Sequence, residues 1–194
     1  MYQLEGCIML PNYKPKTLSK RQEQNAINDW LLSQIQDNPS AVFLTLKFRH
    51  KQIASKEYEN ISLEHAEKLL RIFLRKVDIH YHGYAAATKR RAGVPRLVFK
   101  HMGVFGENVH YHIIALPNDD PHEFVKMAEQ KWASLDTNGW IDCNKSWFEV
   151  VGSDYKELKD ATLYAAREVH KIGAEDSWQI HHTISRTPSI EKTP

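Results

Sequence analysis

The arrangement of apolar and polar residues along the chain predicts four helices. In the first two, apolar side chains recur every three or four residues, as on one face of an amphipathic helix, and the last is rich in good helix formers. The expected helices cover residues 20–36, a stretch that begins at Ser62 as N-cap, residues 121–134 and residues 155–172. Asn38-Pro39 would end the first helix, and Gly173 would cap the last.

Shorter apolar runs between these helices predict strands. The expected strands cover residues 41–48, 96–105, 109–117 and 147–151. Gly106-Glu107 suits the two-residue turn of an antiparallel hairpin between the second and third of them. The pattern therefore predicts an α+β fold, with a central antiparallel sheet flanked by helices. With 194 residues and 42% hydrophobic content, the chain is expected to form one domain over residues 1–186, with a flexible tail over 187–194.

The third strand begins with two histidines one residue apart, His110 and His112. Side chains alternate between the two faces of a strand, so both imidazoles would project to one side, roughly 7 Å apart, while Tyr111 points to the other. Two imidazoles in this arrangement are able to bind one divalent metal ion. A strand edge whose histidines only face solvent is the alternative, and this motif by itself leaves both readings open.

The expected hairpin supplies a third candidate ligand. With residues 106–107 as the turn, His101 lies directly opposite His112, and opposed residues share a face of the sheet. The result would be a cluster of three imidazoles with open positions for water or substrate oxygens. A turn one residue longer would instead place Met102 opposite His112 and remove the third member.

The last expected helix carries a tyrosine among charged residues. Steps of four and seven residues place Tyr164, Glu168 and Lys171 on one face, with Arg167 beside them. A phenol is a poor nucleophile at neutral pH because it holds its proton. A nearby cation or a metal-bound electrophile would change that. An ordinary amphipathic surface helix with a half-buried tyrosine explains the same pattern.

Two other histidine pairs have weaker claims to a site. His80 and His82 repeat the His-Tyr-His triplet, but they follow a charged helix and precede Gly83, which predicts a helix end or a loop. His181 and His182 are expected at the surface, although the strand-like residues 180–184 would also suit an added strand of the sheet.

A net charge of +2 does not identify a nucleic-acid-binding protein, so the position of the charges matters. Basic residues gather at the end of the first strand, with Lys47 and Arg49, and ahead of the hairpin, with Lys89, Arg90 and Arg91. The second group is the favoured phosphate-binding candidate because it precedes the histidines. A solvated surface explains either group equally well.

Two cysteines, Cys7 and Cys143, are too few for a disulfide-stapled secreted domain and have no metal-knuckle spacing. No apolar stretch approaches the ~20 residues of a membrane helix, and the first residues form no apolar signal core. We therefore expect a cytoplasmic protein with no membrane partner.

Three of these motifs occur in the order and spacing of a known family. The strand over residues 41–48, the triplet from His110 to His112, and the segment from Leu163-Tyr164 to Lys171 resemble the motifs of rolling-circle replication initiators. These are members of the HUH endonuclease superfamily, and the chain is similar to the single-tyrosine type. The resemblance spans residues 41–171 and implies the superfamily's palm-like sheet and a metal-dependent enzyme that nicks one DNA strand.

The resemblance also implies roles for single residues. His110 and His112 would bind Mg²⁺ or Mn²⁺, with His101 where many relatives have a glutamate or another ligand. Tyr164 would attack the DNA phosphate, leaving a 5′-phosphotyrosine and a free 3′-OH, and the same site would rejoin strands. Arg167 and Lys171 would activate the tyrosine or hold flanking phosphates.

This chain has Glu168 where many relatives carry a second tyrosine, which puts a two-tyrosine mechanism in doubt. Its carboxylate would activate a water that releases the product, or simply pair with Lys171 or Arg167 on a solvated face. The first role predicts that Glu168→Ala leaves nicking near normal yet lets the protein–DNA adduct accumulate.

The implied partners are origin DNA, single-stranded or folded into a hairpin, and a host polymerase. A host helicase would also be needed because the chain has no Gly-x-x-x-x-Gly-Lys-[Ser/Thr] loop. A single-tyrosine transposase or a conjugative relaxase would use the same chemistry, although relaxases usually have a further histidine close to the pair. A non-catalytic metal- or nucleic-acid-binding module is the remaining alternative.

Overall fold

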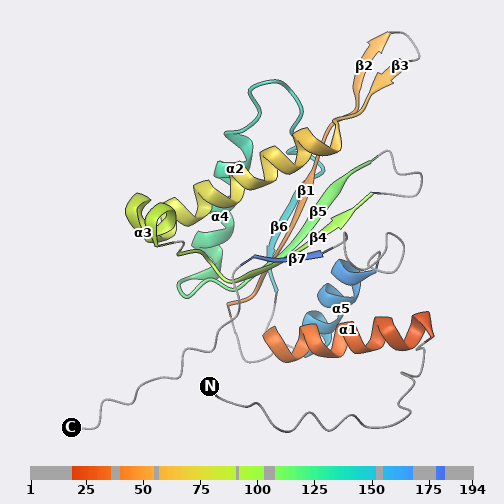
Figure 1. Ribbon diagram of the computed structural model, residues 1–194, viewed down its shortest axis with the longest axis vertical. Helices are drawn as coiled ribbons and strands as arrows, with labels where there is room; N and C mark the ends of the chain where they lie inside the picture. The colour runs from red at the N-terminus through yellow and green to blue at the C-terminus, as the bar shows by residue number, and fades with distance from the viewer. Residues whose placement is uncertain are drawn as a thin grey trace, which may run out of the picture.

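The fold is known from a computed structural model, which describes residues 19–35, 40–54, 57–90, 92–102, 108–151, 155–167 and 178–181. The helices are α1 (Lys20–Ile35), α2 (Leu63–His82), α3 (Tyr84–Lys89), α4 (Pro121–Ala133) and α5 (Tyr155–Ala166). The strands are β1 (Val42–Lys47), β2 (Lys51–Ala54), β3 (Glu57–Glu59), β4 (Arg96–His101), β5 (His110–Ala115), β6 (Trp147–Val150) and β7 (Trp178–His181). Figure 1 shows their arrangement.

The centre of the molecule is a five-stranded sheet in the order β6-β1-β5-β4-β7, and each neighbouring pair is antiparallel. Helices pack on it, so the predicted α+β class is confirmed (Figure 1). The histidine strand β5 lies in the middle, hydrogen-bonded to β1 on one side and β4 on the other. A central strand is the least mobile part of such a sheet, which suits side chains that must keep a fixed geometry.

Each face of the sheet has its own core, because side chains alternate along the strands. Helices α2 and α4 cover the face that carries Leu44, Tyr111 and Ile113. Helices α1 and α5 cover the opposite face, which carries Phe43 and Ile114. His110 and His112 share the parity of Ile114, so they lie on the face of α1 and α5, which we call the site face.

The predicted pairing of His101 with His112 is wrong. His101 lies opposite His110, and Phe99 lies opposite His112. The described pairing of the two strands ends at His101 and His110. The turn expected at residues 106–107 lies outside the described residues. Because the shift in pairing is two residues, an even number, His101 keeps the predicted face.

Several elements differ from the sequence-based expectations or extend them. The small β2–β3 hairpin projects beyond the sheet and was not predicted, because its short polar strands lack apolar alternation (Figure 1). Strand β7 pairs with β4, so the segment containing residues 180 and 181 does join the sheet. Ser62 caps α2 as predicted, accepting from the backbone of His65. The expected helix end at Gly173 and the tail over 187–194 lie outside the described residues.

Across the described part of the chain, no helix is both long enough and apolar enough to span a membrane.

Candidate metal centre and tyrosine

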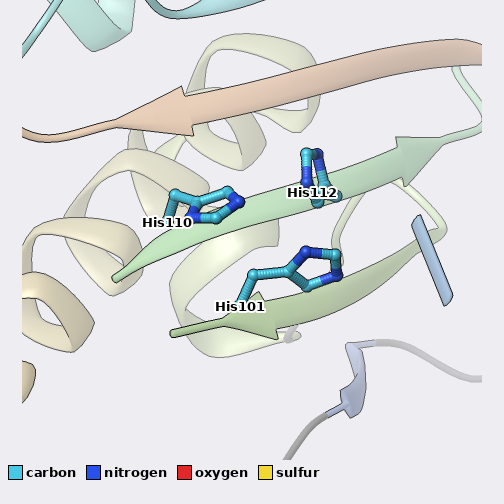
Figure 2. Close-up of side chains that lie close together, drawn as sticks. All are labelled: His101, His110 and His112. Carbon is cyan, nitrogen blue, oxygen red and sulfur yellow. The ribbon is translucent and has the colours of Figure 1, made fainter. Parts of the chain in front are cut away.

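The predicted cluster of three histidines is present on the site face. His110 and His112 come from β5, His101 comes from the end of β4, and the three rings turn toward one another (Figure 2). The ring centroid of His101 is 4.3 Å from that of His112 and 5.2 Å from that of His110, and the latter two are 5.1 Å apart. All three are at most 3% exposed. Solvent-facing histidines, the alternative reading, are therefore excluded.

Hydrogen bonds to protein oxygens orient each ring. His101 donates from Nε2 to the carbonyl oxygen of Ala165 at 2.7 Å, and His110 donates from Nδ1 to the carbonyl oxygen of Asn108 at 2.9 Å. His112 shares a 2.9 Å bond between its Nδ1 and the hydroxyl of Thr45. A carbonyl only accepts, so the first two bonds assign the proton of each neutral ring to the nitrogen that donates.

The remaining nitrogens of these rings carry the lone pairs, as metal-binding histidines require. The Nε2 atom of His112 is buried and accepts no hydrogen bond from the described residues. Burial, followed by the neighbouring His101 and His110, lowers the pKa of His112 from 6.5 to about 2. This imidazole is therefore neutral at physiological pH, which is the form that coordinates a cation.

The spacing of the cluster fits a single ion. One ring nitrogen from each histidine lies within 4.8 Å of the other two. Ligand nitrogens of a tetrahedral site lie roughly 3.4 Å apart, so small side-chain rotations would close the difference. The donor set is compatible with a divalent cation such as Mn²⁺ or Zn²⁺, and three ligands leave open positions for oxygens.

Tyr164 lies beside this cluster. Its ring centroid is 4.9 Å from that of His112 and 6.0 Å from that of Phe43, with both contacts edge-on. Tyr164 is nevertheless 43% exposed, so this residue is accessible from solvent. The guanidinium of Arg167 lies 4.2 Å from the centre of the ring. The predicted tyrosine and one predicted cation are therefore brought together with the histidines.

Two buried hydrogen bonds hold the tyrosine helix in place. One is the bond from His101 to the carbonyl of Ala165, the residue that follows Tyr164. The other runs from the hydroxyl of Thr162 to the side-chain oxygen of Asn28 in α1, at 2.7 Å. Both ends of the second bond are at most 3% exposed. Because unpaired buried polar groups are costly, these bonds favour one rotation of α5 against the sheet.

The predicted DNA-binding residues do not lie together in the structure. Lys47 lies opposite His110 on the neighbouring strand and so shares the site face. Arg49 follows β1 and pairs with Asp136 at 3.5 Å. Lys89 and Arg90 lie at the end of α3, beside α2, and are not brought to the cluster (Figure 1). Arg91, Glu168 and Lys171 lie outside the described residues.

The second His-Tyr-His triplet ends α2, as predicted. His80 is exposed and His82 is half-buried, and Gly83 follows with a positive φ of 78° that favours glycine. Among the described residues, neither His80 nor His82 belongs to a group of side chains that could hold a metal ion.

Sequence reasoning missed Thr45 and Phe43, which contact His112 from β1. A signal for both was present. The strand over residues 41–48 alternates, and Lys47 had already been singled out on it, so its neighbours of the same parity were candidates for the same face. The carbonyl groups of Asn108 and Ala165 leave no such signal, because any residue has one.

No protein-family model, curated protein or solved structure matches this chain.

Proposed function

We propose that this protein is a metal-dependent endonuclease that nicks single-stranded DNA through Tyr164. The observation that carries the proposal is the position of that tyrosine beside a buried cluster of three histidines. Its ring centroid lies 4.9 Å from that of His112. An accessible phenol beside a cation site is the combination that tyrosine attack on a phosphodiester requires. The resemblance of the three sequence motifs supports the same activity.

His101, His110 and His112 would hold the divalent ion, Mg²⁺ or Mn²⁺. When bound, such an ion neutralises charge on the non-bridging oxygens of the scissile phosphate. The guanidinium of Arg167 lies against the ring of Tyr164, where it would hold a phosphate that flanks the reacting one. Lys47, on the same face as the cluster, attracts the flanking backbone of the DNA strand.

In the reaction, the phenolic oxygen of Tyr164 forms a bond to phosphorus, and the bond from phosphorus to the 3′ oxygen breaks. The phenolic proton passes to solvent, and the leaving 3′ oxygen takes up a proton to become a free 3′-OH. The protein keeps the 5′ phosphate as a phosphotyrosine. Because this linkage preserves the phosphodiester's energy, the reverse reaction joins strands.

The first test is a search for the covalent intermediate. Incubation with pools of labelled single-stranded DNA and Mn²⁺, followed by denaturing gels, should give a protein–DNA adduct. Tyr164→Phe should abolish the adduct while Mn²⁺ binding and thermal stability stay unchanged, because only a hydroxyl is lost. Tyr84→Phe, an exposed tyrosine on α3, is the matched control and should form the adduct normally.

A Tyr164→Phe protein that still forms the adduct, through another tyrosine, would refute the assignment. A parent protein that binds DNA and metal yet forms no adduct with any pool would favour the non-catalytic binding module instead.

We propose initiation of rolling-circle replication in a plasmid or phage as the biological role, with a host helicase and polymerase acting on the nicked origin. A single-tyrosine transposase or a conjugative relaxase uses the same chemistry. Supercoiled plasmid carrying a candidate origin separates these roles, because an initiator converts it to the nicked form and primes synthesis from the 3′ end.

A further inference from the structure

A hollow of about 680 Å³ lies next to the histidine cluster, between α5 and the part of the sheet formed by β1 and β6. Thr45 and Tyr164 line it, and both contact His112. Its volume is in the range of small-molecule sites, about 300–1,000 Å³. The hollow therefore adjoins the position of the reacting phosphate and is large enough for a neighbouring nucleotide.

An exposed tryptophan forms one wall of this hollow. Trp147 begins β6, an edge strand of the sheet, and lies directly opposite Thr45. This pairing places its indole on the site face, where it is 61% exposed. A large flat ring that remains exposed beside a hollow gains free energy when a nucleobase stacks on it.

The charges of the hollow are segregated along its length. Lys47 and Lys145 lie at one end, at the C-terminal end of β1 and just before β6. The ion pair of Lys145 with Asp142, 3.8 Å long with the lysine side chain 73% exposed, is a weak surface contact and leaves the ammonium available to a phosphate. This end attracts the DNA backbone.

Carboxylates line the other end. Glu149 lies opposite Phe43, two residues farther along β6 than Trp147, and Glu157 and Asp160 come from the first half of α5. Three carboxylates repel a phosphate, but each accepts hydrogen bonds from N–H groups. A group that donates hydrogen bonds therefore suits this end better than a phosphate does.

We infer that the hollow is a subsite for the base next to the scissile phosphate, and that it selects guanine. The inference rests on the proposed function for the position of the phosphate. The base stacks on Trp147 and turns its donor edge toward Glu149 and the carboxylates of α5. Guanine presents a ring N–H and an amino group side by side, which match the two oxygens of one carboxylate. Thymine presents carbonyl oxygens on both sides of its single N–H, and the carboxylates repel them.

The test measures binding without cleavage. In Tyr164→Phe protein, fluorescence anisotropy would give the affinity for a pentathymidine strand and for versions with one central deoxyguanosine or deoxyinosine. Deoxyinosine lacks only the amino group of guanine. We expect the guanine strand to bind about tenfold more tightly than the inosine strand, because one hydrogen bond to a carboxylate is lost, and the thymine strand to bind least.

Two variants locate the effect. Glu149→Gln should remove most of the difference between guanine and inosine, whereas Glu129→Gln, on the exposed side of α4 across the sheet, should keep it. Trp147→Ala should weaken binding of all three strands about tenfold. Equal affinities for the three strands, or an unchanged affinity in Trp147→Ala, would overturn the inference.

These outcomes are separable from the proposed nicking activity. Adduct formation by the parent protein without base preference in the binding assay would remove the guanine subsite and keep the endonuclease. A guanine preference in binding, with no adduct on any DNA, would keep the subsite and remove the nucleophile.

Discussion

The chain contains the same tripeptide, His-Tyr-His, twice, and the two copies have opposite surroundings. In residues 80–82 the triplet ends a helix, and its histidines are exposed or half-buried. In residues 110–112 it begins the central strand, both histidines are buried on one face, and His101 faces them from the next strand. A two-residue repeat brings histidines together only in a strand, because residues i and i+2 of a helix point in different directions.

The largest expected difference between the triplets is in metal binding. His112→Ala or His110→Ala should weaken Mn²⁺ binding at least about 100-fold, because each would remove one of the three proposed ligands, and losses of only supporting groups already cost 10–100-fold. His80→Ala and His82→Ala should leave the affinity unchanged. Isothermal titration calorimetry on all four variants tests this. Weaker binding in the residue 80 and 82 variants would mean that the metal site had been assigned to the wrong triplet.

The two triplets should also differ in their effect on stability at acidic pH. The pKa of His112 is about 2 in the folded metal-free protein, mainly because of burial, whereas an unfolded histidine has a pKa of about 6.5. Folding thus favours the neutral form of this imidazole. The contribution of His112 to the free energy of unfolding is therefore fully present above pH 6.5 and is lost as the pH falls toward 2. Urea unfolding should give a free energy about 1 kcal/mol lower at pH 5.5 than at pH 7 from this residue.

His112→Asn should remove that part of the pH dependence, while His80→Asn, an exposed position, should retain it. Identical slopes in the parent protein and in His112→Asn would contradict the burial argument.

The smallest expected difference concerns the middle residues of the two triplets, Tyr81 and Tyr111. The hydroxyl of Tyr81 accepts a 2.9 Å hydrogen bond from the backbone of Asp119, so Tyr81→Phe should cost about 1 kcal/mol of unfolding free energy. The hydroxyl of Tyr111 is buried and has no hydrogen-bond partner among the described residues, and burial raises its pKa. Tyr111→Phe should therefore be neutral or slightly stabilising. Thermal denaturation of the two variants side by side distinguishes them, and equal losses would contradict the contrast.

The sequence predicted the face of each site residue better than its exact neighbours. The period of two along a strand places His101, His110 and His112 on one side whatever the length of the connecting loop, provided the shift is even. The pairing itself depended on the loop, and the assumption of a two-residue turn gave the wrong partner for His101. Local patterns thus determine orientation, while pairing depends on segments without regular spacing.

The supporting contacts could not be predicted for a different reason. The bonds from Thr45 to His112 and from Thr162 to Asn28 join residues that are 67 and 134 positions apart. Such pairs depend on how strands and helices are ordered in the fold, and a single sequence contains no local signal for that order. Lys89 and Arg90 precede the histidine hairpin closely in the sequence, yet they lie at the end of α3 and away from the site. Closeness in sequence therefore does not imply closeness in the fold.

The packing of α1 against α5, which includes the bond between Asn28 and Thr162, has a consequence for synthesis on the ribosome. Translation produces α1 and the strands β1, β4, β5 and β6 before α5, so the nascent chain contains its three clustered histidines before it contains Tyr164. Until α5 emerges, the apolar residues of α1 that will pack against it, among them Leu31 and Ile35, lack part of their cover. During that interval the incomplete chain exposes apolar surface that a chaperone would recognise.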